Sequence, residues 1–265
     1  MPDELLYETR DHVATITFNR PERMNTISMR MLDALSTRLL EADADPSVRA
    51  IVITGNGRFW CAGLDVAETA SGGGLGSNQG VTALPGEFDL RNAPPVVLHK
   101  IDTPTIAALN GGAAGYGLDL ALGCDLRIMA EQAKLAFAFA ARGVLPESGG
   151  TWLLPRIVGL SVAADLLYRA RTLSAAESLE LGLANEVVPA GELAARAATI
   201  AGEIAANAPL AVRAAKRMLR HAATEPLEEH VQRQFLALLP LFRTKDFKEG
   251  MASFLEKRPA NFEGR

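Results

Sequence analysis

The amino-acid sequence predicts an α/β fold, and three observations lead to that prediction. Short apolar runs at residues 13–18 and 50–54 have the composition of buried strands. The segment between them places apolar residues at helical spacing, so a helix is expected to connect the two strands. Further strand-like runs are separated by glycine-rich turns. Strands and helices that alternate in this way are typical of sheets covered by helices.

The first helix is expected to begin after Ser28, whose side chain can cap it, and to end before Asp45 and Pro46. Two further strands are expected at residues 105–111 and 125–130, on either side of a glycine-rich turn. Repeated strand and helix units with glycine at the turns are therefore predicted.

A second helix start lies late in this part of the chain. Ser174 and Glu177 have the spacing of a capping box, and Gly182 is placed to end that helix. A strand-like run at residues 184–188 follows, and Pro189 ends it. We expect a structural boundary there.

We predict a core over residues 1–190 and a C-terminal helical region over residues 191–265. The second region is rich in helix-forming residues and reads as three or four helices. The prolines that punctuate it are Pro209, Pro226 and Pro240. Residues 67–95 are too irregular and glycine-rich for a helix or a long strand, and a mobile loop is expected there.

Composition excludes several classes of protein. The 265 residues, 48% of them hydrophobic, can bury a large core. A net charge of −4 without a basic stripe predicts no nucleic-acid partner. No apolar run approaches the roughly 20 residues that span a bilayer, and the start lacks the features of a signal peptide, so no membrane partner and a cytoplasmic location are expected. Cys61 and Cys124 lie too far apart for a CxxC metal pair.

Familiar catalytic motifs are absent from the sequence. There is no P-loop, no HExxH of a zinc hydrolase and no GxSxG nucleophile elbow. A dinucleotide fingerprint fails because residues 118–120, which follow Gly115-Tyr116-Gly117, contain no third glycine. The four histidines lack the spacing of metal ligands. We expect neither a metal nor a separate cofactor.

Five segments carry a specific resemblance to a known family. They are FNRPERMNTIS (18–28), VITGNGRFWCAGLD (52–65), PTIAALNGGAAGYGLDLALGCDLRIMA (104–130), GVLPESGGTWLLPRIVG (143–159) and LSAAESLELGLANEVVP (173–189). In their order and spacing they resemble the crotonase superfamily, the enoyl-CoA hydratase/isomerase family. The resemblance covers nearly the whole chain. It implies a crotonase-like spiral of repeated ββα units, a C-terminal helical region that serves trimerisation, and a homotrimer or a dimer of trimers.

The resemblance also implies an acyl-CoA thioester as substrate, with coenzyme A as part of that substrate rather than as a cofactor. Matched to the family motifs, the backbone N–H groups of Leu64 and Tyr116 form an oxyanion hole. Preorganised N–H donors stabilise the negative charge that develops on a thioester oxygen. The family usually has glycine where Tyr116 stands. The phenol is therefore expected to point away or to line the acyl pocket, where it would narrow the choice of substrate.

The acidic residues decide which reaction the resemblance implies. Hydratases of the family use two glutamates, whose positions are held here by Asp119 and Phe139, and phenylalanine cannot transfer a proton. Glu147 stands where typical hydratases have a small residue and certain isomerases have an acid. We expect Glu147 to be the acid/base of a double-bond shift, with Asp119 as a second catalytic candidate. Phe137 and Phe139 are expected to line an apolar pocket that raises the carboxyl pKa.

The remaining candidates for substrate binding lie around the two glycine turns. The resemblance places Ala62, Gly63 and Asp65 beside the pantetheine arm, and Gly115 in the second turn. Arg23 lies in a matching turn and is a candidate contact for a coenzyme A phosphate.

Other interpretations stay open. The first alternative is an enoyl-CoA hydratase, and thioester hydrolases or dehalogenases are more distant ones. A protein of another class, an inactive acyl-CoA-binding or RNA-binding homologue, would account for Phe139 but leaves Glu147 without a role.

Overall fold

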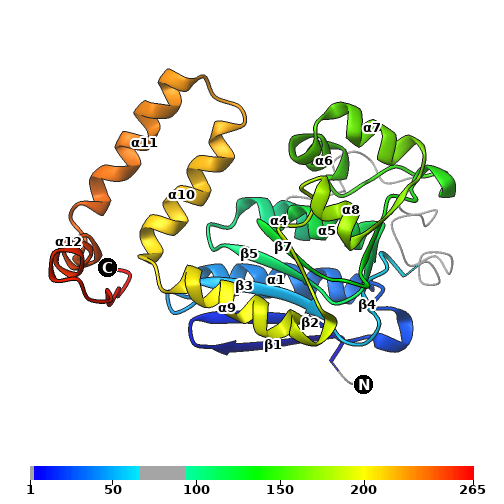
Figure 1. Ribbon diagram of the computed structural model, residues 1–265, viewed down its shortest axis with the longest axis horizontal. Helices are drawn as coiled ribbons and strands as arrows, with labels where there is room; N and C mark the ends of the chain where they lie inside the picture. Colours follow the sequence, from blue (N-terminus) through cyan, green and yellow to red (C-terminus); the bar gives the residue numbers. More distant parts are fainter. Residues whose placement is uncertain (1–2, 66–92) are drawn as a thin grey trace.

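The computed structural model describes residues 3–65 and 93–265, which form two β-sheets covered by helices (Figure 1). The larger sheet contains, in spatial order, β1 (Leu5–Arg10), β2 (Val13–Phe18), β3 (Ala50–Gly55), β5 (Thr105–Leu109), β7 (Leu126–Ala130) and β10 (Glu186–Val188). The smaller sheet contains β4 (Phe59–Cys61), β6 (Gly112–Ala114), β8 (Lys134–Ala136) and β9 (Thr172–Ser174).

The two sheets are built by a repeated turn of the chain. In each of the pairs β3/β4, β5/β6 and β7/β8, the first strand joins the larger sheet and the second joins the smaller one. Strands from successive turns pair in parallel within each sheet. A helix follows each of these pairs: α4 (Pro94–Lys100), α5 (Tyr116–Gly123) and α6 (Gly150–Val158). The predicted α/β spiral of ββα units is confirmed.

The remaining helices of the described residues are α1 (Met29–Ala44), α7 (Leu160–Tyr168), α8 (Ala175–Glu180), α9 (Leu193–Ala205), α10 (Pro209–Ala222), α11 (Leu227–Leu241) and α12 (Lys245–Glu256). Short 3₁₀ turns occur at Pro21–Arg23, Ala140–Arg142 and Ala190–Glu192.

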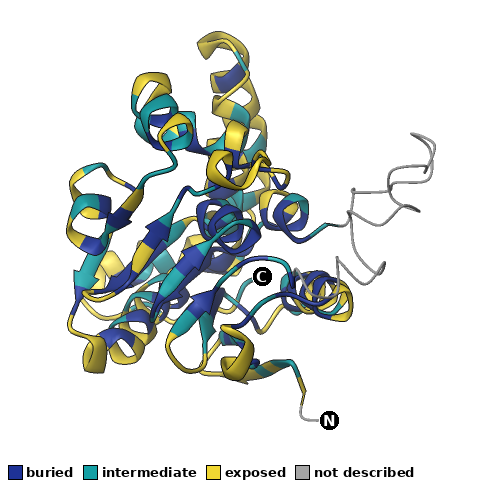
Figure 2. Ribbon diagram, turned by 90° about the vertical axis from the view of Figure 1, so that its right-hand side faces the viewer, coloured by how far each residue is buried: buried dark blue, intermediate teal, exposed yellow. Residues whose placement is uncertain are grey.

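The core lies on both faces of the larger sheet. Side chains of α1, α4 and α5 form one apolar cluster with the strands, and α9 packs on the opposite face through Leu193, Ala197 and Ala201. Figure 2 shows buried residues gathered on the strands and on the helix faces that contact them. The N-terminal end of α5, inside the first cluster, positions the candidate site.

Local sequence signals have the expected structures at several places. The hydroxyl of Ser28 accepts a hydrogen bond from the N–H of Met31 at 3.1 Å and caps α1. The capping box of Ser174 and Glu177 is present at the start of α8. The predicted loop at residues 67–95 is wrong at its C-terminal end, because α4 already begins at Pro94. Proline is tolerated in the first turn of a helix, where its missing N–H has no intrahelical acceptor. The rest of the predicted loop, residues 67–92, lies outside the described residues.

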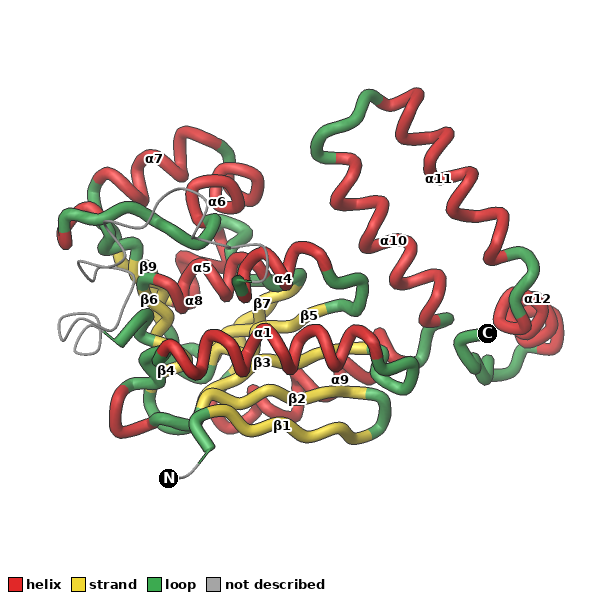
Figure 3. Tube along the Cα trace, turned by 180° about the vertical axis from the view of Figure 1, so that it is seen from behind, coloured by secondary structure: helices red, strands yellow, loops and turns green. Residues whose placement is uncertain are grey.

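Four helices fill the C-terminal region, within the predicted three or four. Pro209 and Pro226 start α10 and α11, but Pro240 lies inside the last turn of α11 and does not divide it. Helices α10 and α11 form an antiparallel pair that stands away from the sheets, with α12 at its end (Figure 3). The domain boundary predicted near residue 190 stays a prediction. Helix α9 follows that boundary in the sequence but packs on the larger sheet. No helix in the described part of the chain has the length and apolar character needed to cross a membrane.

Candidate active site

The first glycine turn follows β4 and pairs with a segment near the N-terminus. The N–H of Ile27 donates to the carbonyl oxygen of Gly63 at 2.8 Å, and the N–H of Asp65 donates to the carbonyl oxygen of Ile27 at 3.0 Å. The C=O and N–H of a trans peptide point in opposite directions. Because the Gly63 carbonyl faces Ile27, the N–H of Leu64 points away from it, and it has no acceptor among the described residues.

The second glycine turn lies against the first. Gly115 precedes α5 with a φ of +53°, and Tyr116 is the first residue of the helix, where an N–H has no intrahelical acceptor. A Cβ added to Gly63, whose φ is +101°, would lie 3.4 Å from the backbone nitrogen of Tyr116 and 3.0 Å from the carbonyl oxygen of Ala114. The two turns are therefore in backbone contact, and the amides of Leu64 and Tyr116 belong to one junction.

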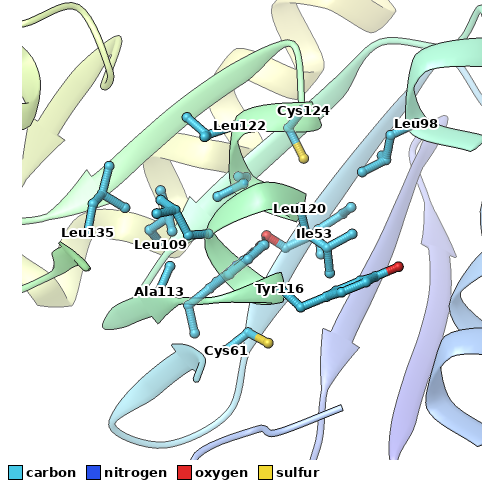
Figure 4. Close-up of a cluster of buried hydrophobic side chains, with 14 of the residues drawn as sticks. Ile53, Cys61, Leu98, Leu109, Ala113, Tyr116, Leu120, Leu122, Cys124 and Leu135 are labelled. Atoms are coloured by element: carbon cyan, nitrogen blue, oxygen red, sulfur yellow. Dashed lines mark hydrogen bonds between the residues drawn. The ribbon is translucent and has the colours of Figure 1, made fainter. Parts of the chain in front are cut away.

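The side chain of Tyr116 is buried at this junction, with 5% of its surface exposed. Figure 4 shows it beside Cys61 in the apolar cluster that also contains Ile53 and Leu120. Burial raises the pKa of the phenol strongly, and the charges of Glu147 and Asp119 add to that effect. The phenol is therefore neutral near pH 7.

Asp119 is fully buried on α5, three residues after Tyr116. Its Oδ2 accepts hydrogen bonds from the backbone N–H of Ser148 at 3.1 Å and from the hydroxyl of Ser148 at 2.8 Å. Burial is the main cause that raises its pKa to about 6; the charge of Glu147 adds to it, and the bonds from Ser148 oppose it.

The second oxygen of Asp119 has a different environment. Oδ1 is buried without a hydrogen-bond partner in the described structure, although the Gly150 N–H is near enough to lower the pKa slightly. A Cβ added to Gly150 would lie 2.2 Å from Oδ1, so only glycine fits beside this carboxylate. Asp119 is thus held by the turn that carries Glu147 and does not extend into open solvent.

Glu147 precedes Ser148 in the turn before α6. The residue is exposed in the isolated chain, but enough protein surrounds its carboxyl group that burial raises the pKa. Its charge acts on both Tyr116 and Asp119. The structure therefore gathers Glu147, Asp119 and Tyr116 at one place, with Asp119 fixing the backbone next to Glu147.

Phe137 and Phe139 are 0% and 4% exposed and belong to the same apolar cluster as Tyr116. They are core residues directly after β8. Their role as walls of an acyl pocket stays a prediction. A surface hollow of about 520 Å³ lies elsewhere, on α12 and the C-terminal segment, and its lining is mostly charged.

The candidate substrate-binding residues of the first turn have different surroundings. Arg23 has 55% of its side chain exposed and lies 3.8 Å from Asp65. The carboxylate of Asp65 is buried and accepts a hydrogen bond from Arg20 at 2.9 Å. Ala62 donates its N–H to the carbonyl oxygen of Met24 at 3.1 Å.

Two residues at the site were not among the sequence candidates. Ser148 and Arg20 both lie inside segments that carry the family resemblance, but only the folded chain shows their partners. No local pattern identifies either contact, because the partners lie 29 and 45 residues apart in the sequence.

Comparison with known proteins gives the family. The profile described as enoyl-CoA hydratase/isomerase matches residues 8–265. The chain is 34% identical over 270 residues to the 1,2-epoxyphenylacetyl-CoA isomerase of Escherichia coli (strain K12), covering 100% of both chains. It is also 34% identical over 269 residues to the crotonyl-CoA hydratase of Syntrophomonas wolfei, covering 98% of both. The crystal structure of an enoyl-CoA hydratase from Bacillus anthracis superposes with a TM-score of 0.89 at 32% identity, covering 99% of this chain and 100% of that one.

The spiral of ββα turns is that of the crotonase superfamily, whose solved members it matches in fold. The chain belongs to the enoyl-CoA hydratase/isomerase family and is an enzyme of that family. The relatives named above include both an isomerase and a hydratase, so their names do not decide the reaction.

Proposed function

We propose that this enzyme shifts the double bond of an enoyl-CoA through an enolate, with Glu147 as the single acid/base. The proposal rests on the different burial and hydrogen bonding of the two carboxyl groups. Asp119 is fully buried and bonded to Ser148, whereas Glu147 is accessible beside the junction of the two glycine turns. Only one carboxylate is then free to meet a substrate.

The reaction needs no other proton carrier. The carboxylate of Glu147 removes a proton from C2 of a 3-enoyl thioester, and the C–H electron pair moves toward the carbonyl group to give a dienolate. The N–H groups of Leu64 and Tyr116 donate to the thioester oxygen, which carries the negative charge. The protonated Glu147 then returns the proton to C4. The product is the 2-enoyl thioester.

Apolar surroundings suit this role. Desolvation raises the pKa of Glu147, which brings the acid and base forms closer in energy near neutral pH. The neutral phenol of Tyr116 lies at the same junction and, in this proposal, lines the acyl pocket.

The alternative is enoyl-CoA hydration, which asks for two groups that handle protons. Phe139 occupies one of the two hydratase positions, and Asp119 at the other has no exposed surface. Hydration by this chain would require substrate and water to reach the buried Oδ1 of Asp119, whose other oxygen is held by Ser148. The relative from Syntrophomonas wolfei, named crotonyl-CoA hydratase, keeps this alternative in view.

We also propose a homotrimer or a dimer of trimers. Large apolar side chains are exposed on α11 and α12: Val231, Phe235, Leu236, Phe254 and Leu255. Light scattering of the purified protein tests this proposal, and a monomeric mass contradicts it. The cytoplasmic location and the absence of a nucleic-acid partner stay predictions.

The reaction is tested by offering the purified protein 3-enoyl-CoA and 2-enoyl-CoA separately and identifying the products. An isomerase converts the first into the second without adding water. Formation of a 3-hydroxyacyl-CoA from 2-enoyl-CoA, without any double-bond shift, overturns the proposal in favour of hydration.

A further inference from the structure

A buried ion pair directly follows the Leu64 amide. Nη2 of Arg20 donates to Oδ2 of Asp65 at 2.9 Å, and the two side chains are 11% and 6% exposed. Nη1 of Arg20 also donates to the carbonyl oxygen of Thr26 at 2.8 Å. The guanidinium group thus links the segment after Leu64 to the turn at residues 20–27.

Stability alone is a weak reason for this arrangement. The desolvation of two buried charges commonly cancels their attraction, so such pairs often contribute little net stability. Arg20 satisfies both of its terminal nitrogens with geometry that a lysine or an apolar side chain cannot reproduce.

The backbone shows what the pair holds in place. Gly63 and Asp65 both hydrogen-bond to Ile27, on the side of the turn at residues 20–27. Leu64 between them presents its N–H to the side away from Ile27, and the second glycine turn lies in contact with the neighbouring Gly63. Because the Gly63 carbonyl and the Leu64 N–H belong to one peptide plane, the hydrogen bond from Ile27 sets the direction of that N–H, and the pairing of Asp65 with Arg20 holds the next peptide in place.

We propose that Arg20 and Asp65 are positioning residues that fix the direction of the Leu64 N–H toward the substrate oxyanion. The inference rests on the proposed function, in which that amide stabilises an enolate. Neither side chain needs to touch the reacting atoms, so both act through the backbone.

The test measures enolate stabilisation directly, without turnover. Acetoacetyl-CoA ionises to an enolate with its own near-ultraviolet absorption, whereas butyryl-CoA forms no comparable enolate and reports binding of the uncharged thioester. Both ligands are titrated into the wild type, Asp65→Asn and Arg20→Lys, and the apparent pKa of bound acetoacetyl-CoA is measured from the absorption.

We expect each variant to raise the apparent pKa of bound acetoacetyl-CoA and to lose affinity for its enolate by about 10-fold or more. This loss is smaller than the roughly 10²- to 10³-fold rate effect of removing an oxyanion-hole donor, because the amide is misdirected rather than lost. Affinity for butyryl-CoA should change much less. If Asp65→Asn does not fold, Arg20→Lys decides the question alone.

Asp43→Asn is the matched control. Asp43 pairs with Arg213 at 2.9 Å, with side chains 23% and 24% exposed, near the C-terminal end of α1. The turn at residues 20–27 precedes the other end of this helix, which is 16 residues and about 24 Å long. The control should lose stability but keep the wild-type ratio of enolate to thioester affinity.

The outcomes separate this inference from the proposed function. Wild-type ionisation of acetoacetyl-CoA that both variants retain unchanged overturns the inference, as does a wild type that produces no enolate. Ionisation that is lost in the variants supports the inference, even if no double-bond shift is found and the proposed function fails.

Discussion

Ser148 donates two hydrogen bonds to a single oxygen of Asp119, one from its backbone N–H and one from its hydroxyl. This relationship ties α5, which begins with the Tyr116 amide, to the turn that carries Glu147. The contact between Asp119 and Ser148 therefore helps to hold both the Tyr116 amide and Glu147 in place. Changes to this contact should affect catalysis and stability together.

Replacement of Ser148 by alanine removes the hydroxyl donor but keeps the backbone bond to Asp119. Hydrogen bonds to charged groups contribute about 1.5–3 kcal/mol, so a loss of unfolding free energy of about that size is expected. Chemical denaturation near pH 8 measures it. Ser161→Ala, at an exposed position on α7, is the control and should be close to neutral. Equal stability of the two variants contradicts the assigned contact.

Asp119 makes stability depend on pH. Its pKa is raised from 3.8 to about 6 in the folded chain, mainly by burial, so the folded state binds the proton more tightly than the unfolded state. The resulting stabilisation is complete below about pH 4 and is lost as the pH rises through about 6. Compared with Asp119→Asn, the wild type should lose up to about 3 kcal/mol across this range. A difference in unfolding free energy between the wild type and Asp119→Asn that stays constant from pH 4 to pH 7 would contradict this assignment.

The rate should rise with pH on the acid side, because Glu147 must be ionised to accept the C2 proton. Burial raises its pKa, so the midpoint of this rise should lie above the ordinary glutamate value of about 4.3. The charge of Asp119 is not among the causes of this rise, so Asp119→Asn should keep a midpoint close to that of the wild type. Rates at saturating substrate from the wild type and Asp119→Asn test both points. A wild-type midpoint at or below the ordinary glutamate value contradicts the effect of burial on Glu147.

Gly63→Ala tests the contact between the two turns. The added Cβ would lie 3.0 Å from the carbonyl oxygen of Ala114, and a φ of +101° strains any other residue. We expect kcat to fall at least about 10-fold, with a smaller change in KM, because displaced oxyanion donors weaken the transition state most. Gly191→Ala, where an added Cβ meets nothing within 4 Å, is the control. Equal kcat values for both variants would contradict a role of the contact between the two turns in catalysis.

The larger sheet could be predicted largely from the sequence. Residues 13–18 and 50–54 coincide with β2 and with nearly all of β3, because buried strands leave a clear apolar signal. β1 leaves no such signal, since it is a partly polar edge strand with mostly exposed residues. The strands of the smaller sheet have three residues each, too few for any periodicity to show.

The candidate site could also be predicted only in part. Family motifs pointed to the segments that contain Leu64, Tyr116 and Glu147, and the fold brings these segments together. The partners of Asp119 and Asp65 could not be predicted, because they come from 29 and 45 residues away in the sequence. Such contacts depend on how the turns of the spiral stack, which local patterns do not contain.

The most direct test of Glu147 as the acid/base is the rate of 3-enoyl-CoA isomerisation by Glu147→Gln. We predict a loss of at least about 100-fold, with acyl-CoA binding retained. Asp119→Asn should lose less, and Glu180→Gln, at an exposed position on α8, should match the wild type. An unchanged rate in Glu147→Gln contradicts the central claim, and equal losses in Glu147→Gln and Asp119→Asn favour a two-acid mechanism instead.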